Sequence, residues 1–182
     1  MRSDRFNYRN EALTLKGLNT MDTTIPEENL LANYGAWRLK AITPHTQKLL
    51  DDFPKLFRPC ASPFGDWGFQ CGEGWFDLVY QLCADIEQAA TTAKLDPNSD
   101  RWPLMRQIKA KFAVLRVYFD LLNPDQQDDE LRQRINALIR EAEDKSGAIC
   151  ERCKLVGTPK ANRSGMWVRI TCPTCEEKRE QF

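Results

Sequence analysis

The residues with the clearest chemistry are four cysteines near the C-terminus. Cys150 and Cys153 form one Cys-x-x-Cys pair, and Cys172 and Cys175 form a second pair after the 18 residues 154–171. A two-residue spacer lets a tight turn aim both sulfurs at one ion, and two such turns complete a tetrahedron around Zn²⁺. We therefore predict one structural zinc ion in a zinc ribbon. Redox-active dithiols are the alternative, and they fit this spacing less well.

Such a site is closed, because four protein ligands leave no position for a catalytic water. Other catalytic groups are scarce, since His45 is the only histidine and its spacing to the cysteines supports no pairing of nucleophile and base. Asp66, Glu73 and Asp77 could bind Mg²⁺, but the helix dipole also stabilises carboxylates near a helix start without any chemistry. We predict that the protein is not an enzyme, with a metal-dependent hydrolase or nuclease as the alternative.

Two groups of side chains are candidates for binding a partner. Aromatic residues crowd the Gly- and Pro-rich stretch 58–74 and its continuation into 75–76, where they form either a recognition platform or core packing. Residues 145–182 hold eight basic against four acidic residues, an excess that suits either a nucleic-acid contact or a solvated surface. The candidates are Trp67, Phe69, Trp75, Arg152, Lys154, Lys160, Arg163 and Arg169.

The composition limits the classes of protein that this chain can be. Its 182 residues suffice for one domain with a small satellite module, and 42% hydrophobic residues can fill a core. Lys plus Arg equals Asp plus Glu at 26 each, so the overall positive charge of a typical duplex-DNA binder is missing. An odd count of seven cysteines favours metal binding in a reducing compartment over a secreted disulfide framework. Since we find no bilayer-length apolar run and no signal-peptide core, we expect a soluble cytoplasmic protein.

Hydrophobic spacing predicts the elements that must position these groups. Apolar residues at three- and four-residue intervals predict helices within 44–57, within 75–90, and from the break at 123–125 to Ser146. The stretch 104–122 fits either a helix or two strands, and its valine and aromatic content favours a β-hairpin. Alternating apolar residues at 166–171 predict the strand that delivers the second cysteine pair.

These elements predict an α+β fold: a mainly helical domain with a short antiparallel β-hairpin and a C-terminal zinc ribbon. The predicted divisions are a flexible N-terminal segment at 1–25, a core domain at 26–146 and a four-cysteine ribbon module at 147–182. The Gly-Glu-Gly sequence at 72–74 is interpreted as a tight turn that opens a helix, because it lacks the further features of a phosphate-binding loop.

Several segments carry a resemblance to a known family. They are FPKLF at 53–57, WGFQCGEGWFDL at 67–78, QIKAKFAVLRVY at 107–118, Ala142, Ser146 and the two cysteine pairs. Over residues 49–176 the chain resembles a family of bacteriophage and prophage proteins with a Gly-x-Gly-Trp-Phe-Asp-Leu turn and a C-terminal four-cysteine zinc ribbon. Ala113 stands where this family usually has glycine, a departure that weakens the case for a tight hairpin turn there.

The resemblance brings no established activity and no catalytic residues, but it implies a phage or mobile-element origin. Small proteins of that origin often bind a host machine, anti-CRISPR and other anti-defence inhibitors included. We therefore expect a non-enzymatic binding protein, in the host bacterial cytoplasm, that blocks or redirects a host protein or ribonucleoprotein complex. We expect no membrane partner and no small-molecule substrate. The alternative is a nucleic-acid-binding or transcription-related accessory protein that uses the basic zinc ribbon.

Overall fold

The structure is a computed structural model that describes residues 43–58, 69–121, 128–161, 165 and 168–180. Its elements are α1 (Pro44–Asp52), β1 (Phe69–Gln70), η3 (Glu73–Trp75), α3 (Phe76–Thr92), β2 (Leu104–Lys111), β3 (Val114–Asp120), α4 (Asp128–Ser146), β4 (Thr158–Ala161), β5 (Val168–Thr171) and α5 (Pro173–Glu180). The predicted α+β class is confirmed. Among the described helices, none combines the length and the apolar character that a bilayer span requires.

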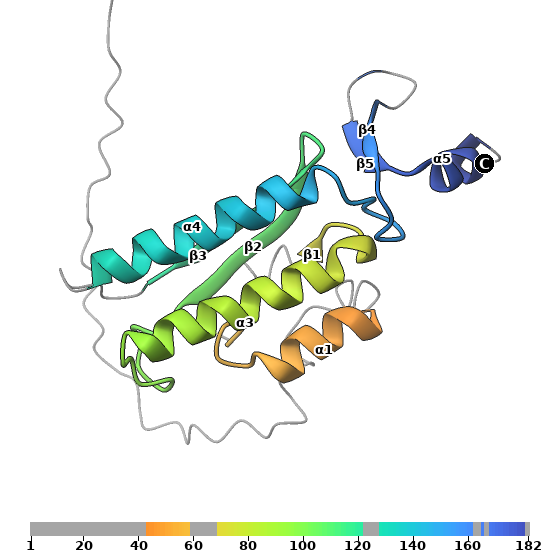
Figure 1. The fold of residues 1–182 in the computed structure, drawn as a ribbon. Helices are drawn as coiled ribbons and strands as arrows, with labels where there is room; N and C mark the ends of the chain where they lie inside the picture. Colours follow the sequence, from red (N-terminus) through yellow and green to blue (C-terminus); the bar gives the residue numbers. More distant parts are fainter. Residues whose placement is uncertain (1–42, 59–68, 122–127, 162–164, 166–167, 181–182) are drawn as a thin grey trace, which may run out of the picture.

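The main sheet has three strands in the order β1-β2-β3, and α3 and α4 lie side by side across it (Figure 1). The predicted hairpin is confirmed: β2 and β3 pair antiparallel from Leu104 opposite Asp120 to Lys111 opposite Val114. The short β1 adds to β2 in parallel, a pairing that the sequence did not predict. Strands β4 and β5 form a separate antiparallel pair at one end of the molecule. We call these two strands, together with the two cysteine turns that flank them, the ribbon.

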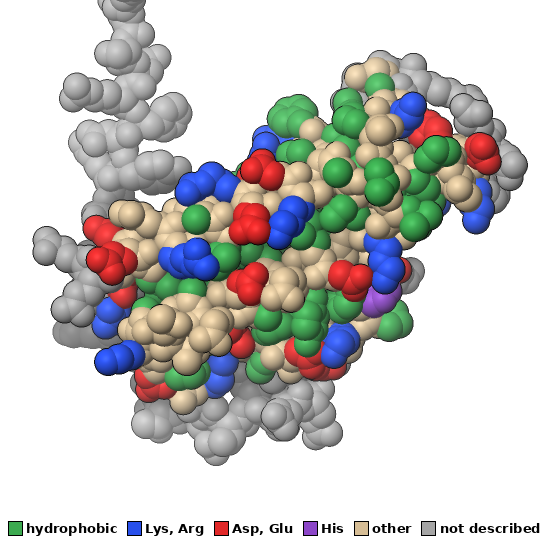
Figure 2. Space-filling view, in the orientation of Figure 1, with side chains coloured by type: hydrophobic (Ala, Val, Ile, Leu, Met, Phe, Trp, Pro, Cys, Tyr) green, Lys and Arg blue, Asp and Glu red, His purple; other side chains and the backbone are tan. Residues whose placement is uncertain are grey.

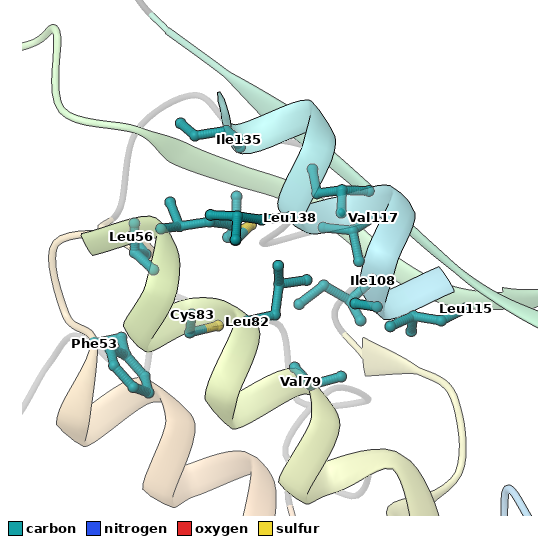
Figure 3. Close-up of a cluster of buried hydrophobic side chains, with 14 of the residues drawn as sticks. Phe53, Leu56, Val79, Leu82, Cys83, Ile108, Leu115, Val117, Ile135 and Leu138 are labelled. Carbon is teal, nitrogen blue, oxygen red and sulfur yellow. The ribbon is translucent and has the colours of Figure 1, made fainter. Parts of the chain in front are cut away.

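The hydrophobic core lies between the sheet and the helices, as Figure 3 shows. Helix α3 turns Val79, Leu82 and Cys83 inward at the helical spacing that predicted it. They meet strand residues such as Ile108 and, from α4, side chains such as Leu138. Burial of these apolar side chains is the main favourable free energy that holds the layers together.

Polar contacts fix both ends of α4. At its start, the buried Asp128 carboxylate accepts hydrogen bonds from Arg101 at 2.6 and 3.0 Å. At its end, the buried Ser146 hydroxyl donates to the Glu143 carbonyl at 2.6 Å and accepts from the Leu115 N–H at 2.8 Å. Since the ribbon follows directly after Ser146, these contacts set where the first cysteine pair begins.

The turn between β2 and β3 has two residues, Phe112 and Ala113, and both have positive φ, at 53° and 63°. The tight turn thus forms although Ala113 stands in place of glycine. A two-residue hairpin turn of this kind matches the twist of the strands and favours Asn-Gly, because a side chain other than glycine or asparagine strains at positive φ. The Phe112 side chain is 78% exposed, so the core gains little from this ring.

We expect Phe112→Asn to raise the free energy of unfolding by about 1 kcal/mol, because asparagine adopts positive φ at lower cost than phenylalanine. Denaturation by urea, followed by circular dichroism, measures the change. The matched control is Phe112→Ala, which removes the ring but keeps the strain. Equal stabilities of the asparagine and alanine variants would contradict this account of the turn.

Candidate metal centre

The first cysteine pair sits in a tight turn at the start of the ribbon. An isolated bridge pairs Ile149 with Val156, and inside it the Cys150 N–H donates to the Leu155 carbonyl at 2.7 Å. The Lys154 N–H donates back to the Cys150 carbonyl at 3.0 Å, and Lys154 itself has φ of 59°. These bonds close the turn, so the sulfurs of residues 150 and 153 are held on the same side.

The second pair lies where β5 passes into α5. Cys172 follows the last residue of β5, and Pro173 opens the helix, a position where its missing N–H costs nothing. The N–H groups of Cys175 and Glu176 both donate to the Cys172 carbonyl, at 3.1 and 3.0 Å. This helical turn brings the two sulfurs together, as the two-residue spacer predicts.

The ligand atoms of Cys150, Cys153, Cys172 and Cys175 all lie within 4.8 Å of one another, so the four cysteines could hold a metal ion. Three of these side chains are buried and Cys153 is half-buried. In the part of the chain that the structure describes, no other group of three or more His, Cys, Asp or Glu residues meets this geometry. The four predicted ligands are therefore brought together at one point.

The sulfurs are too close to be four free thiolates. Burial alone would raise the pKa of the Cys150 thiol. Backbone N–H groups of Arg152, Cys172 and Cys153 stabilise its thiolate instead, and they lower the pKa to about 7. The pKa of Cys175 is raised to about 12, first by its contact with the Cys153 sulfur and then by burial. A divalent cation stabilises all four thiolates at once, which makes this donor set suited to a metal.

The ribbon packs closely on the segment before α3. A Cβ added to Gly72 or Gly74 would lie 2.2 Å from the carbonyl oxygen of Glu151 or Cys150, so only glycine fits at either position. The Gly74 N–H donates to that Glu151 carbonyl at 2.8 Å, and the Trp75 indole N–H donates to the Ile149 carbonyl at 2.8 Å. The turn predicted at 72–74 does open the helix, and its glycines also let the ribbon approach.

These contacts correct one predicted partner-binding residue. Trp75 is fully buried, with 0% exposure, because its ring fills the core and its only polar atom bonds to the ribbon. The prediction that Trp75 contacts a partner is wrong for the folded chain. Phe69 is half-buried and packs near Phe57, with ring centroids 5.6 Å apart. Trp67 lies outside the described residues, so its role stays a prediction.

The basic residues predicted to bind a partner differ in whether a carboxylate lies next to them. Arg152, Lys160 and Arg169 are exposed and lack a carboxylate partner among the described residues. Lys154 is also exposed, but its ammonium lies 3.1 Å from the Asp77 carboxylate on α3. Arg163 lies outside the described residues.

The other groups with possible chemistry are dispersed. Asp66 and Cys60 are outside the described residues, and Asp77 is paired with Lys154, as above. Glu73 lies 3.6 Å from the imidazole of His45. Burial and the charge of Glu151 raise the pKa of Cys71 to about 12, and burial also raises that of Cys83, which the core encloses.

Sequence reasoning missed four residues at this end of the molecule: Lys109, Lys111, Phe112 and Glu151. They line a groove between the β2–β3 turn and the ribbon. Only Glu151 could be suspected from the sequence. The glycines at 72 and 74 indicate that another backbone segment approaches closely, but they do not identify that segment. No protein-family model, curated protein or solved structure matches this chain.

We expect Cys172→Ser to lose the metal and to loosen residues 149–175, because at such sites the binding free energy of the metal is folding free energy. Hydrogen exchange read by mass spectrometry should show faster exchange there and at the Gly74 amide, whose acceptor is on the ribbon. Exchange in α3 should remain slow. Cys71→Ala, which leaves all four ligands in place, is the control. An unchanged ribbon in Cys172→Ser would contradict the role of the metal.

Proposed function

We propose that the protein is a non-enzymatic binding protein that docks on another macromolecule through the β2–β3 turn and the metal ribbon. The observation that carries this proposal is that four large apolar side chains of the β2–β3 turn and the ribbon are exposed. Hydrophobic atoms also gather toward this end of the molecule in Figure 2. We call these residues the docking surface: Phe112, Leu155, Val156 and Val168. Soluble proteins rarely leave such side chains together in water without a partner.

The exposure of this surface is large. Val156 is 81% exposed and Leu155 is 59% exposed, although both belong to a turn that hydrogen bonds close tightly. Phe112 keeps an aromatic ring at a position where asparagine would relieve backbone strain. A rigid apolar surface loses little conformational entropy on binding, which favours docking on a protein.

The dispersed carboxylates favour binding over catalysis. Asp77 and Glu73 lie next to Lys154 and His45, and the cysteine cluster offers four protein ligands with no free position for a water. These arrangements support a metal that orders the ribbon instead of acting on a substrate.

The class of partner follows from the resemblance to phage and prophage proteins. A small protein of that origin with a rigid docking surface fits an inhibitor of the anti-CRISPR or other anti-defence type, which blocks or redirects a host protein or ribonucleoprotein complex. Exposed cations beside the docking surface, Arg152, Lys160 and Arg169, favour an acidic surface on that partner.

Those same cations support a second candidate, a nucleic-acid-binding or transcription-related accessory protein. Phosphate contacts release counterions, so binding through them weakens steeply between low and physiological salt. Binding through the apolar docking surface depends little on salt.

We also propose that the metal is zinc. A tetrahedron with Zn–S bonds of about 2.3 Å places its sulfurs about 3.8 Å apart. In the structure the Cys153 and Cys172 sulfurs are 3.4 Å apart, and all four lie within 4.8 Å of one another. Small movements of these side chains therefore suffice to bind a zinc ion.

Elemental analysis of protein purified without chelators should find about one zinc ion per chain, as expected for a single four-thiolate site. The Cys172→Ser variant, purified in the same way, is the control and should contain far less. Wild-type protein that is folded and contains no zinc, or contains iron instead, would rule out this assignment.

The docking surface predicts a partner that survives nuclease. Tagged wild-type protein should retain a stoichiometric protein from bacterial lysate, and Val156→Asp should reduce its recovery by about tenfold, because a charge replaces an apolar contact. Ala93→Asp adds the same charge to an exposed residue just after α3, at the end away from the ribbon, and serves as the control. Equal recovery by the two variants would contradict the docking surface. Recovery that nuclease abolishes would favour the nucleic-acid candidate.

A further inference from the structure

A groove of about 510 Å³ lies between the β2–β3 turn and the ribbon. Its lining includes Lys109, Lys111 and Phe112 from the hairpin, and Glu151 and Arg169 from the ribbon. This volume falls within the range of sites that bind small organic groups. The groove therefore joins three cations, one carboxylate and one aromatic ring in a single space.

The carboxylate in this groove lacks a partner for one oxygen. Glu151 is only 4% exposed, and its Oε1 accepts a hydrogen bond from the Gly72 N–H at 3.1 Å. Its Oε2 is buried and has no hydrogen-bond partner among the described residues. An unsatisfied buried carboxylate oxygen is costly. Because this oxygen is buried, a donor on a ligand reaches it only when the surrounding side chains move, and the new hydrogen bond would relieve that cost.

The cations around the carboxylate also lack acidic partners. Lys109, Lys111 and Arg169 form no ion pair within the described part of the chain. The Lys109 ammonium donates to the Gln107 side chain at 2.7 Å and lies 5.0 Å from the centre of the exposed Tyr118 ring. Three cations against one carboxylate give the groove a net positive charge, which attracts an anion.

We propose that this groove binds single-stranded nucleic acid. A nucleotide brings together the three chemistries that the groove offers: a phosphate for the cations, a flat base to stack on Phe112, and an exocyclic amine to donate to Glu151 Oε2. An acidic peptide fits less well, because its acidic side chains offer no donor to Glu151 and no flat ring to stack on Phe112. DNA and RNA strands share this chemistry.

This inference rests on the nucleic-acid candidate proposed above and deepens it, because it assigns that binding to one groove and to single strands. Phe112 and Val168 belong both to the docking surface and to the groove, whereas Lys109, Lys111 and Glu151 belong only to the groove and Val156 only to the docking surface. Variants at these unshared residues test the two proposals separately.

Glu151 should discriminate among bases. Its Oε2 accepts from the N4 amine of cytosine, whereas the O4 of thymine at the same place would face it as a second acceptor. In Glu151→Gln, the amide oxygen takes over the bond from the Gly72 N–H, and the amide NH₂ then replaces Oε2. We expect wild-type protein to prefer oligo-dC over oligo-dT, and Glu151→Gln to lose or reverse this preference.

The experiment is a fluorescence-anisotropy titration of the full chain, loaded with zinc, against labelled single strands of about ten nucleotides, the length scale of such sites. Probes are oligo-dC, oligo-dT, oligo-rC and oligo-rU at several salt concentrations. Lys109→Ala/Lys111→Ala should weaken binding at low salt by about tenfold and reduce the slope of log affinity against log salt by about 1.4, since each phosphate contact on a single strand contributes about 0.7. If the lysine variant loses the same affinity for DNA and for RNA strands, the contacts are to the phosphates and bases that both share. If the protein binds RNA strands more tightly, the 2′-hydroxyl is a further contact.

The matched control is Lys48→Ala/Lys55→Ala, which removes the same charge from α1 and from the turn after it. It should bind as wild type does, and so should Val156→Asp. The proposal is overturned if no strand binds at low salt, or if the control pair loses as much affinity as the groove pair. It is equally overturned if a polyglutamate peptide competes as well as oligo-dC, which would assign the groove to an acidic protein.

Discussion

Two stretches of backbone far apart in the sequence, 72–75 and 149–151, approach so closely that a methyl group at Gly72 or Gly74 would overlap a carbonyl oxygen. The amide of Gly74 and the indole of Trp75 use this proximity to donate to the ribbon. Because α3 begins immediately afterwards, one contact fixes both the start of the central helix and the first cysteine turn. The groove beside the hairpin is lined by residues of both the hairpin and the ribbon, the two parts that this contact helps to hold together.

The features that local chemistry determines could be predicted from the sequence. The spacing of Val79, Leu82 and Ile86 predicts α3, the valine and aromatic content of 104–122 predicts a hairpin, and the two cysteine pairs predict a metal cluster. In each case the signal lies within one element or one turn. The division into domains at 26–146 and 147–182 stays a prediction, and the extensive contact at 72–75 joins the two parts.

The features that depend on contacts between distant segments could not be predicted. The density of aromatic residues around Trp75 does not distinguish core from surface, and its burial and its bond to the Ile149 carbonyl depend on a segment more than 70 residues away. The Phe112-Ala113 turn lacks the glycine that usually marks such a turn, so its strain is visible only in φ. The groove combines residues of β2 and β5, which lie far apart in the sequence, with Glu151, whose buried oxygen no sequence pattern reveals.

The placement of the thiols gives the molecule an uneven chemical reactivity. Nucleophilic attack by sulfur requires the thiolate, and the raised pKa values of Cys71 and Cys83 leave almost none of it near neutral pH. Although burial opposes it, backbone N–H groups lower the pKa of Cys150, which lies in the ribbon, to about 7. Oxidants and alkylating reagents that gain access to the described thiols should therefore act first at the metal cluster, and damage there would loosen the ribbon part of the docking surface while the helical core stays folded.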